Sequence, residues 1–532
     1  MSFLMGGLLL QAQSVETGNQ LYYYERYQSS ENHFHTVLAQ QPANAEAWYG
    51  LTKAYLAQKK WDKAADSLRL APSGLHAEPF YQVAYGTVLL EQDKKDSAAF
   101  YFNSALKKTK EKNEAILAAV ADAHVQSKNG DGNYAVEIAN KAIKRSKKNP
   151  ANHLLLGDAY RKLNNGSEAY KAYKQSLETD DRYAAAYHKI GEIFLTQKNA
   201  ELYVEYFTKA VNADPSYAPS LYQLYIYHFY RDVAKAFDYY NQYVAKADPS
   251  IQNEYDLADL LYLTKEYNKA IDKANSLAAS QGNQLKPRIY KLLAYSHAEL
   301  KDSARAIEYM QQYFGKEEDS NFIAKDFETM ALFYTNMEGK QDSALVFYEK
   351  AAGLQKDSTV LFGYYKNLSN LAKAQKDYAA QAKWLAKYYN GNEKATNVDL
   401  FNWGLAHFLG EDYAMADSVF GMYVSKYPEQ TFGYYWQARS NAALDKEMTE
   451  GTAIPYYKNL ITALEKDTAN SNYKKWMVEA YAYLAAYEAN TEKDYPQAVG
   501  YFQKVLEVDP ENADAKRYIS ILQSNSTSEG SK

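Results

Sequence analysis

The feature that most constrains the fold is a pattern of apolar residues that returns about every 34 residues. In the copy at 45–78, these residues are three or four positions apart on both sides of a break at 58–60, as on one face of a helix. They are Trp48, Leu51, Tyr55, Trp61, Ala64, Leu68 and Ala71. The spacing predicts two amphipathic helices joined by a tight turn, and its return predicts an array of such pairs.

Two later copies add a small residue at a constant place in each helix. One copy contains Leu156, Gly157, Tyr160, Ala169 and Tyr173, and the next contains Tyr187, Ile190, Gly191, Phe194, Tyr203, Phe207, Ala210 and Pro215. These residues resemble the tetratricopeptide repeat, which has a Trp-x2-Leu-Gly-x2-Tyr first helix, an Ala-x3-Phe second helix and a closing Pro. The resemblance implies an all-α, right-handed superhelical solenoid of about thirteen helical hairpins.

The repeats extend over nearly the whole chain, and breaks in the apolar pattern suggest its division. We expect an N-terminal array at 13–280 and a C-terminal array at 281–523, because Gly and Asn replace the pattern at 279–286. A second interruption lies at 390–397. An array needs a polar outer face at its end, so 512–523 is expected to be a capping helix, followed by a disordered tail at 524–532.

Composition excludes several classes of function. The chain has 60 Lys and Arg against 65 Asp and Glu, a net charge of −5, and no block of basic residues for nucleic acid. It contains no Cys, which excludes disulfides and thiolate metal ligands. It contains 53 Tyr, a residue suited to half-buried helix faces and to contact surfaces.

No arrangement of residues in the sequence predicts catalysis. His124, His228, His297 and His407 occupy the place where the repeat has Tyr, so we interpret them as half-buried rings rather than ligands. Carboxylate pairs lie at unit boundaries, where they suit helix caps. We therefore expect no catalytic residue, no metal site and no cofactor, and a protein that is not an enzyme.

The remaining candidate is a surface. In tetratricopeptide arrays the first helix of each unit lines the concave face, and the resemblance implies that aromatic and basic residues point into it here. The predicted partner-binding residues are Tyr222, Phe229, Tyr230, Tyr255, Tyr262, Arg288, Lys291, Tyr295, Tyr435 and Arg439. Such residues are typical of peptide-binding grooves. The prediction is a non-enzymatic scaffold that binds a partner protein or peptide segment, with the stretch from Tyr222 to Tyr295 as its main contact.

An alternative function stays open. Aromatic faces stack on sugars, and some outer-membrane sugar-binding proteins use tetratricopeptide helices as a frame. The tyrosines could therefore serve a glycan-binding or outer-membrane uptake accessory protein. Those proteins carry long insertions between repeats and usually a lipidated Cys, and this sequence has neither.

The N-terminus bears on the compartment. Phe3 to Leu10 is apolar and resembles the central region of a secretory signal, and Leu10-Gln11-Ala12 resembles a cleavage end. Residues 1–12 are thus predicted to be a truncated signal peptide remnant. The chain then resembles bacterial envelope scaffolds and is expected in the periplasm, with peripheral envelope association. A cytoplasmic protein is the alternative. No later apolar run approaches the roughly 20 residues of a membrane span.

Overall fold

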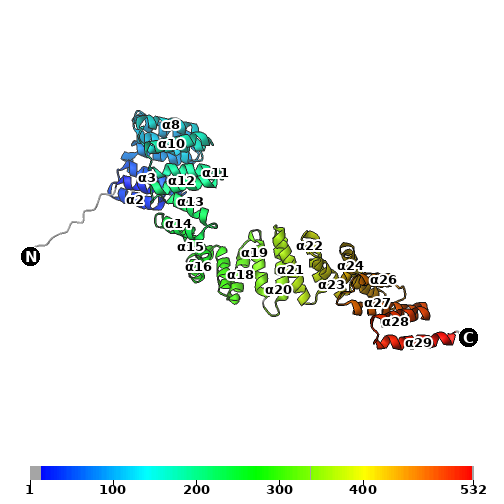
Figure 1. Cartoon of the computed structure of the whole chain (residues 1–532). Helices are drawn as coiled ribbons and strands as arrows, with labels where there is room; N and C mark the ends of the chain where they lie inside the picture. The colour runs from blue at the N-terminus through cyan, green and yellow to red at the C-terminus, as the bar shows by residue number, and fades with distance from the viewer. Residues whose placement is uncertain (1–13, 336, 530–532) are drawn as a thin grey trace, which may run out of the picture. The chain divides into compact units, whose positions relative to one another are not determined.

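The computed structural model describes residues 14–335 and 337–529, the backbone alone for 525–529, and every regular element in this part of the chain is a helix. The predicted signal remnant at 1–12 lies outside the described residues. Two compact units are present, residues up to Leu300 and residues from Lys301 (Figure 1). The interval 279–286 lies inside the first unit, where Gly282–Gln284 forms a short 3-10 helix. The predicted boundary at 280/281 stays a prediction.

The helices of the N-terminal unit follow one another with short turns. They are α1 (Val15–Tyr23), α2 (Tyr27–Gln40), α3 (Ala45–Ala57), α4 (Trp61–Arg69), α5 (Pro79–Glu91), α6 (Lys95–Lys108), α7 (Glu114–Gln126), α8 (Gly132–Arg145), α9 (Pro150–Lys162), α10 (Gly166–Thr179), α11 (Ala184–Thr196), α12 (Ala200–Ala213), α13 (Ala218–His228), α14 (Val233–Val244), α15 (Ile251–Leu263), α16 (Tyr267–Gln281) and α17 (Arg288–Glu299), with the 3-10 helix η1 (Ser73–Leu75) before α5.

The C-terminal unit has the same organisation. Its helices are α18 (Ser303–Lys316), α19 (Ala324–Thr335), α20 (Gln341–Leu354), α21 (Ser358–Ala374), α22 (Tyr378–Gly391), α23 (Asn397–Leu409), α24 (Tyr413–Lys426), α25 (Thr431–Leu444), α26 (Ile454–Lys466), α27 (Tyr473–Tyr487), α28 (Tyr495–Val508) and α29 (Ala513–Glu529), with the 3-10 helix η3 (Asp319–Asn321) and the π-helical turn η4 (Glu488–Glu492). Helix α29 continues to Glu529, beyond the predicted start of the tail.

The helices form hairpins that stack one on the next. In the N-terminal unit each pair from α1–α2 to α15–α16 packs together, and in the C-terminal unit so does each pair from α19–α20 to α27–α28. Most second helices also pack on the first helix of the following pair, as α2 does on α3 and α22 on α23. The all-α solenoid predicted from the period is therefore the observed fold.

A glycine in the first helix lets an aromatic ring of the second helix approach the backbone. A Cβ atom at Gly157 would lie 2.2 Å from the Tyr173 ring, and one at Gly191 would lie 2.6 Å from the Phe207 ring. Both rings are fully buried. The small and large residues of the repeat pattern are thus paired across each hairpin, which allows the close helix crossing that the stack requires.

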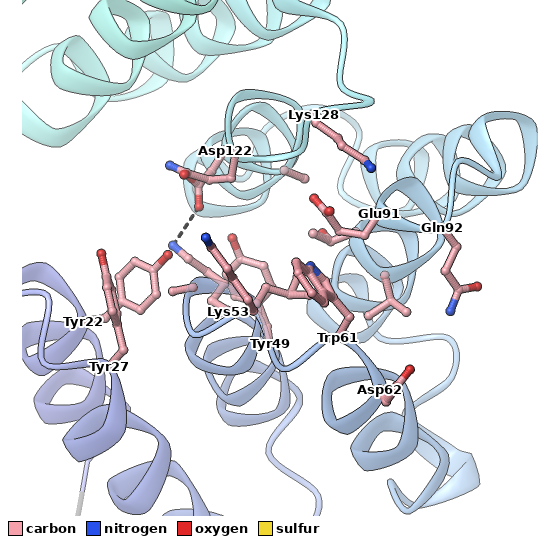
Figure 2. A pocket seen from close by; sticks show the side chains of 17 residues that line it. Tyr22, Tyr27, Tyr49, Lys53, Trp61, Asp62, Glu91, Gln92, Asp122 and Lys128 are labelled. Atoms are coloured by element: carbon pink, nitrogen blue, oxygen red, sulfur yellow. Dashed lines mark hydrogen bonds and ion pairs between the residues drawn. The ribbon is translucent and has the colours of Figure 1, made fainter. Parts of the chain in front are cut away.

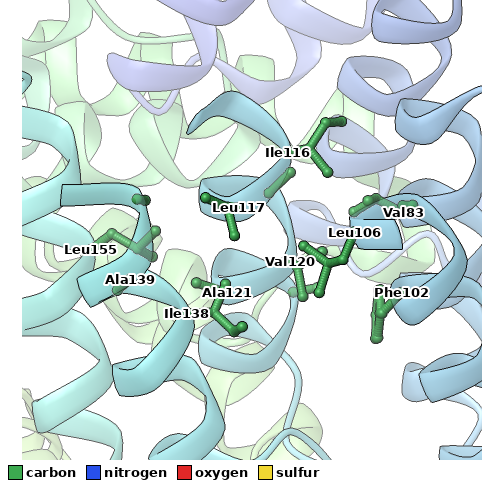
Figure 3. Packing of buried hydrophobic residues seen from close by; sticks show 14 of the residues in the cluster. Val83, Phe102, Leu106, Ile116, Leu117, Val120, Ala121, Ile138, Ala139 and Leu155 are labelled. Atoms are coloured by element: carbon green, nitrogen blue, oxygen red, sulfur yellow. The ribbon is translucent and has the colours of Figure 1, made fainter. Parts of the chain in front are cut away.

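Alanine and aliphatic residues fill the space between neighbouring hairpins. Around α7, Ile116, Leu117 and Val120 pack among side chains of α5, α6, α8 and α9 (Figure 3). The predicted second-helix residues Ala98 and Phe102 belong to the same cluster, and both are buried. The core is therefore continuous along the stack, and each hairpin buries its apolar face on its neighbours.

Polar residues make the turns inside the hairpins. Lys59, Lys198 and Glu411 each have a φ near +60° and close the turn between two helices of a pair. The break at Gln58-Lys59-Lys60 is the turn that the sequence predicts. No helix among the described residues is both long enough and apolar enough to cross a membrane.

Candidate partner-binding site

A cleft of about 600 Å³ lies on the N-terminal unit, lined by the first helices of successive hairpins (Figure 2). Helices α3, α5 and α7 present their side chains to it, because each first helix turns the same face to this side. The end of α1, the start of α2 and the start of α4 complete the wall. The labelled lining residues are Tyr22, Tyr27, Tyr49, Lys53, Trp61, Asp62, Glu91, Gln92, Asp122 and Lys128.

An ion pair crosses one end of the cleft. Nζ of Lys53 on α3 lies 2.8 Å from Oδ2 of Asp122 on α7. The same Nζ lies 4.3 Å from the centre of the Tyr22 ring and 5.6 Å from that of Tyr49, within the range of cation–π attraction. Lys53 is therefore held in place by groups from three helices.

Burial and charge set the protonation states at this end. Burial raises the pKa of Tyr22 to about 12, although the Lys53 charge opposes that shift. Burial alone would lower the pKa of Lys53, but Asp122 and the two tyrosines outweigh it and raise that pKa well above its usual value. Lys53 is thus charged and the Tyr22 hydroxyl neutral at physiological pH.

The other end of the cleft is open and aromatic. Trp61, the first residue of α4, keeps 52% of its surface exposed, and Figure 2 shows it near Glu91 and away from Tyr22. Charged residues of both signs, Asp62, Glu91 and Lys128, belong to the same lining. An exposed ring on a lining with charges of both signs suits an extended segment with an apolar side chain and polar neighbours.

A second group of charges lies deeper on the first helices α9 and α11. Arg161 forms an ion pair with Glu192, whose carboxylate also lies 3.2 Å from Lys189 Nζ and 3.4 Å from His188 Nε2. The Tyr173 hydroxyl donates to Asp158 at 2.7 Å. Burial raises the pKa of Asp158. For Glu192, the bond from His188 and the adjacent cations outweigh burial and hold its pKa well below its usual range. The charged residues are half-buried and pair with each other.

The structure brings some of the sequence-predicted contact residues together on α13 to α17. The Tyr222 ring lies 5.9 Å from Tyr225, which also contacts Phe229 at 5.6 Å. The Tyr230 ring contacts Phe229 and is 84% exposed. Tyr230 is therefore the most accessible of the predicted residues whose exposure is described.

The adjoining predicted residues lie on α15 and α17. Tyr262 and Tyr295 have their ring centres 6.3 Å apart. Arg288 forms an ion pair with Asp259, and Nζ of Lys291 lies 5.8 Å from the Tyr295 ring. The two basic residues therefore point toward side chains of this unit, and their role toward a partner stays a prediction.

Two predicted contact residues are core residues instead. Tyr255 is 1% exposed, and its hydroxyl accepts the Lys286 N–H at 3.1 Å. Tyr435 is 4% exposed and stacks on Trp476 with 4.3 Å between ring centres. Arg439 lies beside Tyr435, 5.7 Å from its ring. The prediction that Tyr255 and Tyr435 contact a partner is corrected, because hairpin packing removes both rings from the surface.

The histidines in the tyrosine position are half-buried rings where their contacts are described. Nδ1 of His124 accepts the backbone N–H of Asp131 at 3.0 Å, and burial lowers the pKa of this ring to about 4. Nε2 of His407 accepts from the Trp403 indole at 3.1 Å. The described residues contain no cluster of three or more His, Asp and Glu side chains able to hold a metal ion.

Sequence reasoning missed the aromatic end of the cleft. Trp61 was assigned to the repeat pattern, where it fits as an apolar position of the second helix. In the structure it is the first residue of α4 and is half exposed. A tryptophan directly after a hairpin turn was the available signal.

Two segments match family models for the tetratricopeptide repeat, at 21–79 and 154–218. The "Ancillary SecYEG translocon subunit" of Buchnera aphidicola is 33% identical over 90 residues, which are 17% of this chain. The match spans 46% of that relative, so the chain covers about half of its length.

Solved structures of repeat proteins are also similar. The C-terminal part of a tetratricopeptide repeat-containing protein from Cytophaga hutchinsonii is 26% identical, with 50% of this chain and 99% of that chain covered and a TM-score of 0.30. A tetratricopeptide repeat protein from Parabacteroides merdae is 16% identical, with 47% and 96% covered and a TM-score of 0.29.

The family matches agree with the helix pairs and with the glycine–ring packing inside them. The segment at 21–79 includes the hairpin α3–α4, and the segment at 154–218 includes the hairpin α11–α12. The chain is a multi-repeat tetratricopeptide repeat protein.

Proposed function

We propose that this protein is a scaffold that binds a segment of a partner protein in the cleft formed by α3, α5 and α7. The observation that supports this proposal is the exposed Trp61 ring at the open end of that cleft, near Glu91. Exposed tryptophans that enter a partner's pocket, or receive an apolar side chain, are frequent sources of binding energy. Repeat proteins of this family are typically scaffolds rather than enzymes.

The predicted surface around Tyr222 to Tyr295 is a second contact region for the same function. The exposed Tyr230 and the half-buried Phe229 provide an aromatic pair there. Tyr262 and Tyr295 add two neighbouring rings. A partner that followed the first helices from α3 toward α17 could contact both the cleft at Trp61 and this second region. Variants in each region measure its contribution to binding.

We also propose that the protein works at the bacterial cell envelope. The signal-like residues 3–10 support export, and a relative named as an ancillary translocon subunit is compatible with an envelope-associated role. Mass measurement of the mature N-terminus in the native organism tests this proposal. Loss of the apolar residues before Gln13 supports export, and an intact N-terminus in the cytoplasmic fraction argues against it.

The binding proposal is tested by affinity capture with matched variants. Trp61→Ala removes the ring in the cleft, and Phe100→Ala removes a ring that is 69% exposed on α6 and outside the lining. We expect Trp61→Ala to reduce recovery of the partner at least tenfold, and Phe100→Ala to leave it unchanged. Equal recovery with both variants would place the contact elsewhere, and Tyr230→Ala then tests the second region.

The same variants address the glycan alternative. A panel of soluble polysaccharides is titrated against the parent chain and against Trp61→Ala. The scaffold proposal predicts no saturable binding to any of them. Saturable binding that Trp61→Ala abolishes would support the glycan-binding function instead.

A further inference from the structure

The first hairpin contacts segments that lie far along the chain within the N-terminal unit. The Tyr23 hydroxyl at the end of α1 accepts the backbone N–H of Ala185, near the start of α11, at 3.2 Å. The Tyr23 ring lies 5.5 Å from the Tyr183 ring and 5.3 Å from the Tyr217 ring. One tyrosine of the first hairpin therefore covers two aromatic rings that belong to hairpins well beyond its neighbours.

A carboxylate from the far end of the unit caps helix α2. The N-cap residue Arg26 makes no side-chain cap bond of its own. Oδ2 of Asp248 accepts the backbone N–H groups of Gln28 at 2.8 Å and Ser29 at 3.1 Å, and Oδ1 accepts the Ser29 hydroxyl. Arg26 Nε lies 3.5 Å from the same carboxylate. Asp248 thus takes the place of the N-cap side chain and meets the positive end of the helix dipole.

A third contact of the α1–α2 turn lies between the Tyr23 contact and the Asp248 cap in the sequence. The Tyr24 hydroxyl donates to Oδ2 of Asp214 at 2.9 Å, and Asp214 directly follows α12. The turn between α1 and α2 therefore touches the array at three points, near residues 185, 214 and 248.

Helix α1 buries little surface on its neighbours, whereas α2 buries Phe34, Val37 and Leu38 in the core. Gly18 is the one buried residue of α1, so this helix contributes little apolar surface to the stack. α1 packs on α2 and α3, and its remaining contacts are the polar bonds and the Tyr23 ring. Terminal elements with little buried apolar surface open most easily.

We propose that α1 and the turn that joins it to α2 form a releasable clasp that closes the N-terminal unit on itself. In the closed state Tyr23 covers the rings of Tyr183 and Tyr217, and Asp248 fixes the start of α2. Release of the clasp exposes these two rings. It also changes the wall of the cleft, because Tyr22 and Tyr27 line it, but the test of the clasp does not depend on the proposed partner.

Distance measurements in solution test the clasp directly. The chain has no Cys, so two engineered cysteines can carry spin labels without background. Glu16→Cys on α1 and Lys246→Cys beyond α14 are suitable, because both side chains are exposed. If the clasp is closed, the distance between the two spin labels should have one narrow distribution in the otherwise unchanged full chain. After Asp248→Ala or Tyr23→Ala, this distance should become longer and its distribution broader. The control is Asp238→Ala, an exposed residue of α14 whose described bond is to Gln242 in the same helix.

Hydroxyl-radical footprinting supplies a second readout. We expect oxidation of Tyr217 to increase at least threefold in Asp248→Ala and Tyr23→Ala, with no change in Asp238→Ala and unchanged helical circular dichroism. A broad distribution in the parent chain would overturn the proposal. So would Tyr217 oxidation that is the same in all variants, or that rises equally in the Asp238 control.

Discussion

The two units use the same hairpin but connect their hairpins differently. In the N-terminal unit, Tyr23, Tyr24 and Asp248 link the first hairpin to residues between 160 and 220 positions away. In the described part of the C-terminal unit, side-chain hydrogen bonds join neighbouring hairpins, as the bond from Tyr435 to Glu479 does. A linear repeat array has nearest-neighbour stability, so we expect the long-range contacts to make the N-terminal unit cooperative over a greater length.

The largest expected effect comes from removing the ring that packs against the helix glycine. Phe207→Ala in the N-terminal unit and Phe420→Ala in the C-terminal unit remove equally buried side chains, at 1% and 0% exposed. Each substitution is expected to lower the free energy of unfolding by about 3–5 kcal/mol. Hydrogen exchange of the full chain should show faster exchange around both sites, reaching residues 22–29 in Phe207→Ala alone, since Tyr23 contacts Tyr217 just beyond α12.

The proposed difference between the two units is wrong if both phenylalanine variants change hydrogen exchange only in their adjacent hairpins. It is also wrong if Phe420→Ala accelerates exchange over several hairpins of the C-terminal unit. Either result would show that the long-range contacts of the first hairpin do not couple it to the rest of its unit.

A smaller effect is expected from adding a methyl group beneath the ring. Gly191→Ala and Gly404→Ala place a Cβ atom 2.6 Å from Phe207 and 2.8 Å from Phe420, so each ring must move. The expected loss of stability is about 1–3 kcal/mol. Gly500→Ala is the control, because its Cβ meets nothing within 4 Å and the substitution should stabilise α28 slightly. Thermal unfolding followed by circular dichroism provides the measurement.

The N-terminal unit should also lose stability in mild acid. The pKa of His124 is lowered from 6.5 to about 4 by burial, so the unfolded chain binds a proton more readily than the folded chain. The neutral His124 ring makes its full contribution to the free energy of unfolding above pH 6.5, and this contribution is lost as the pH falls toward 4. The loss at pH 5 is expected to be about 2 kcal/mol.

Local hydrogen exchange in α7 and α8 at pH 8 and pH 5, corrected for intrinsic rates, measures this loss. His124→Gln should show less pH dependence than the parent. The exposed His76→Gln should behave as the parent does. A pH dependence unchanged by His124→Gln would assign the acid effect to another group.

The smallest effect is expected at an ion pair with an exposed lysine. Lys474 Nζ lies 2.8 Å from Asp509 in the C-terminal unit, and the lysine side chain is 66% exposed. Water screens this pair, so Lys474→Ala should change stability by no more than about 0.5 kcal/mol. A loss of stability above about 2 kcal/mol, measured by thermal unfolding, would show that the packing of α27 and α28 depends on this ion pair.

The hairpins could be predicted from sequence because their contacts are local and periodic. Gly191 and Phe207 lie at constant places in the repeat, and so do Ala98 and Phe102. The order of helices and the turn at Lys59 followed from these spacings. Helix pairs of this kind are determined by neighbours that lie within one repeat or the next.

The surface could be predicted only in part. Tyr255 and Tyr435 occupy positions that the family turns toward a ligand, but here the adjacent hairpin covers their rings. The cap from Asp248 to α2 joins residues about 220 positions apart, and no periodic pattern connects them. Whether a ring is exposed depends on the size of its neighbours, which the repeat spacing does not specify.

The central claim is that the protein binds a partner segment at the cleft between α3, α5 and α7. Its most direct test places a photo-crosslinking amino acid at position 61, and separately at the exposed position 100, in cells of the native organism. We expect position 61 to crosslink one defined protein that position 100 does not crosslink. Crosslinks to the same proteins from both positions, or none from position 61, would argue against binding at this cleft.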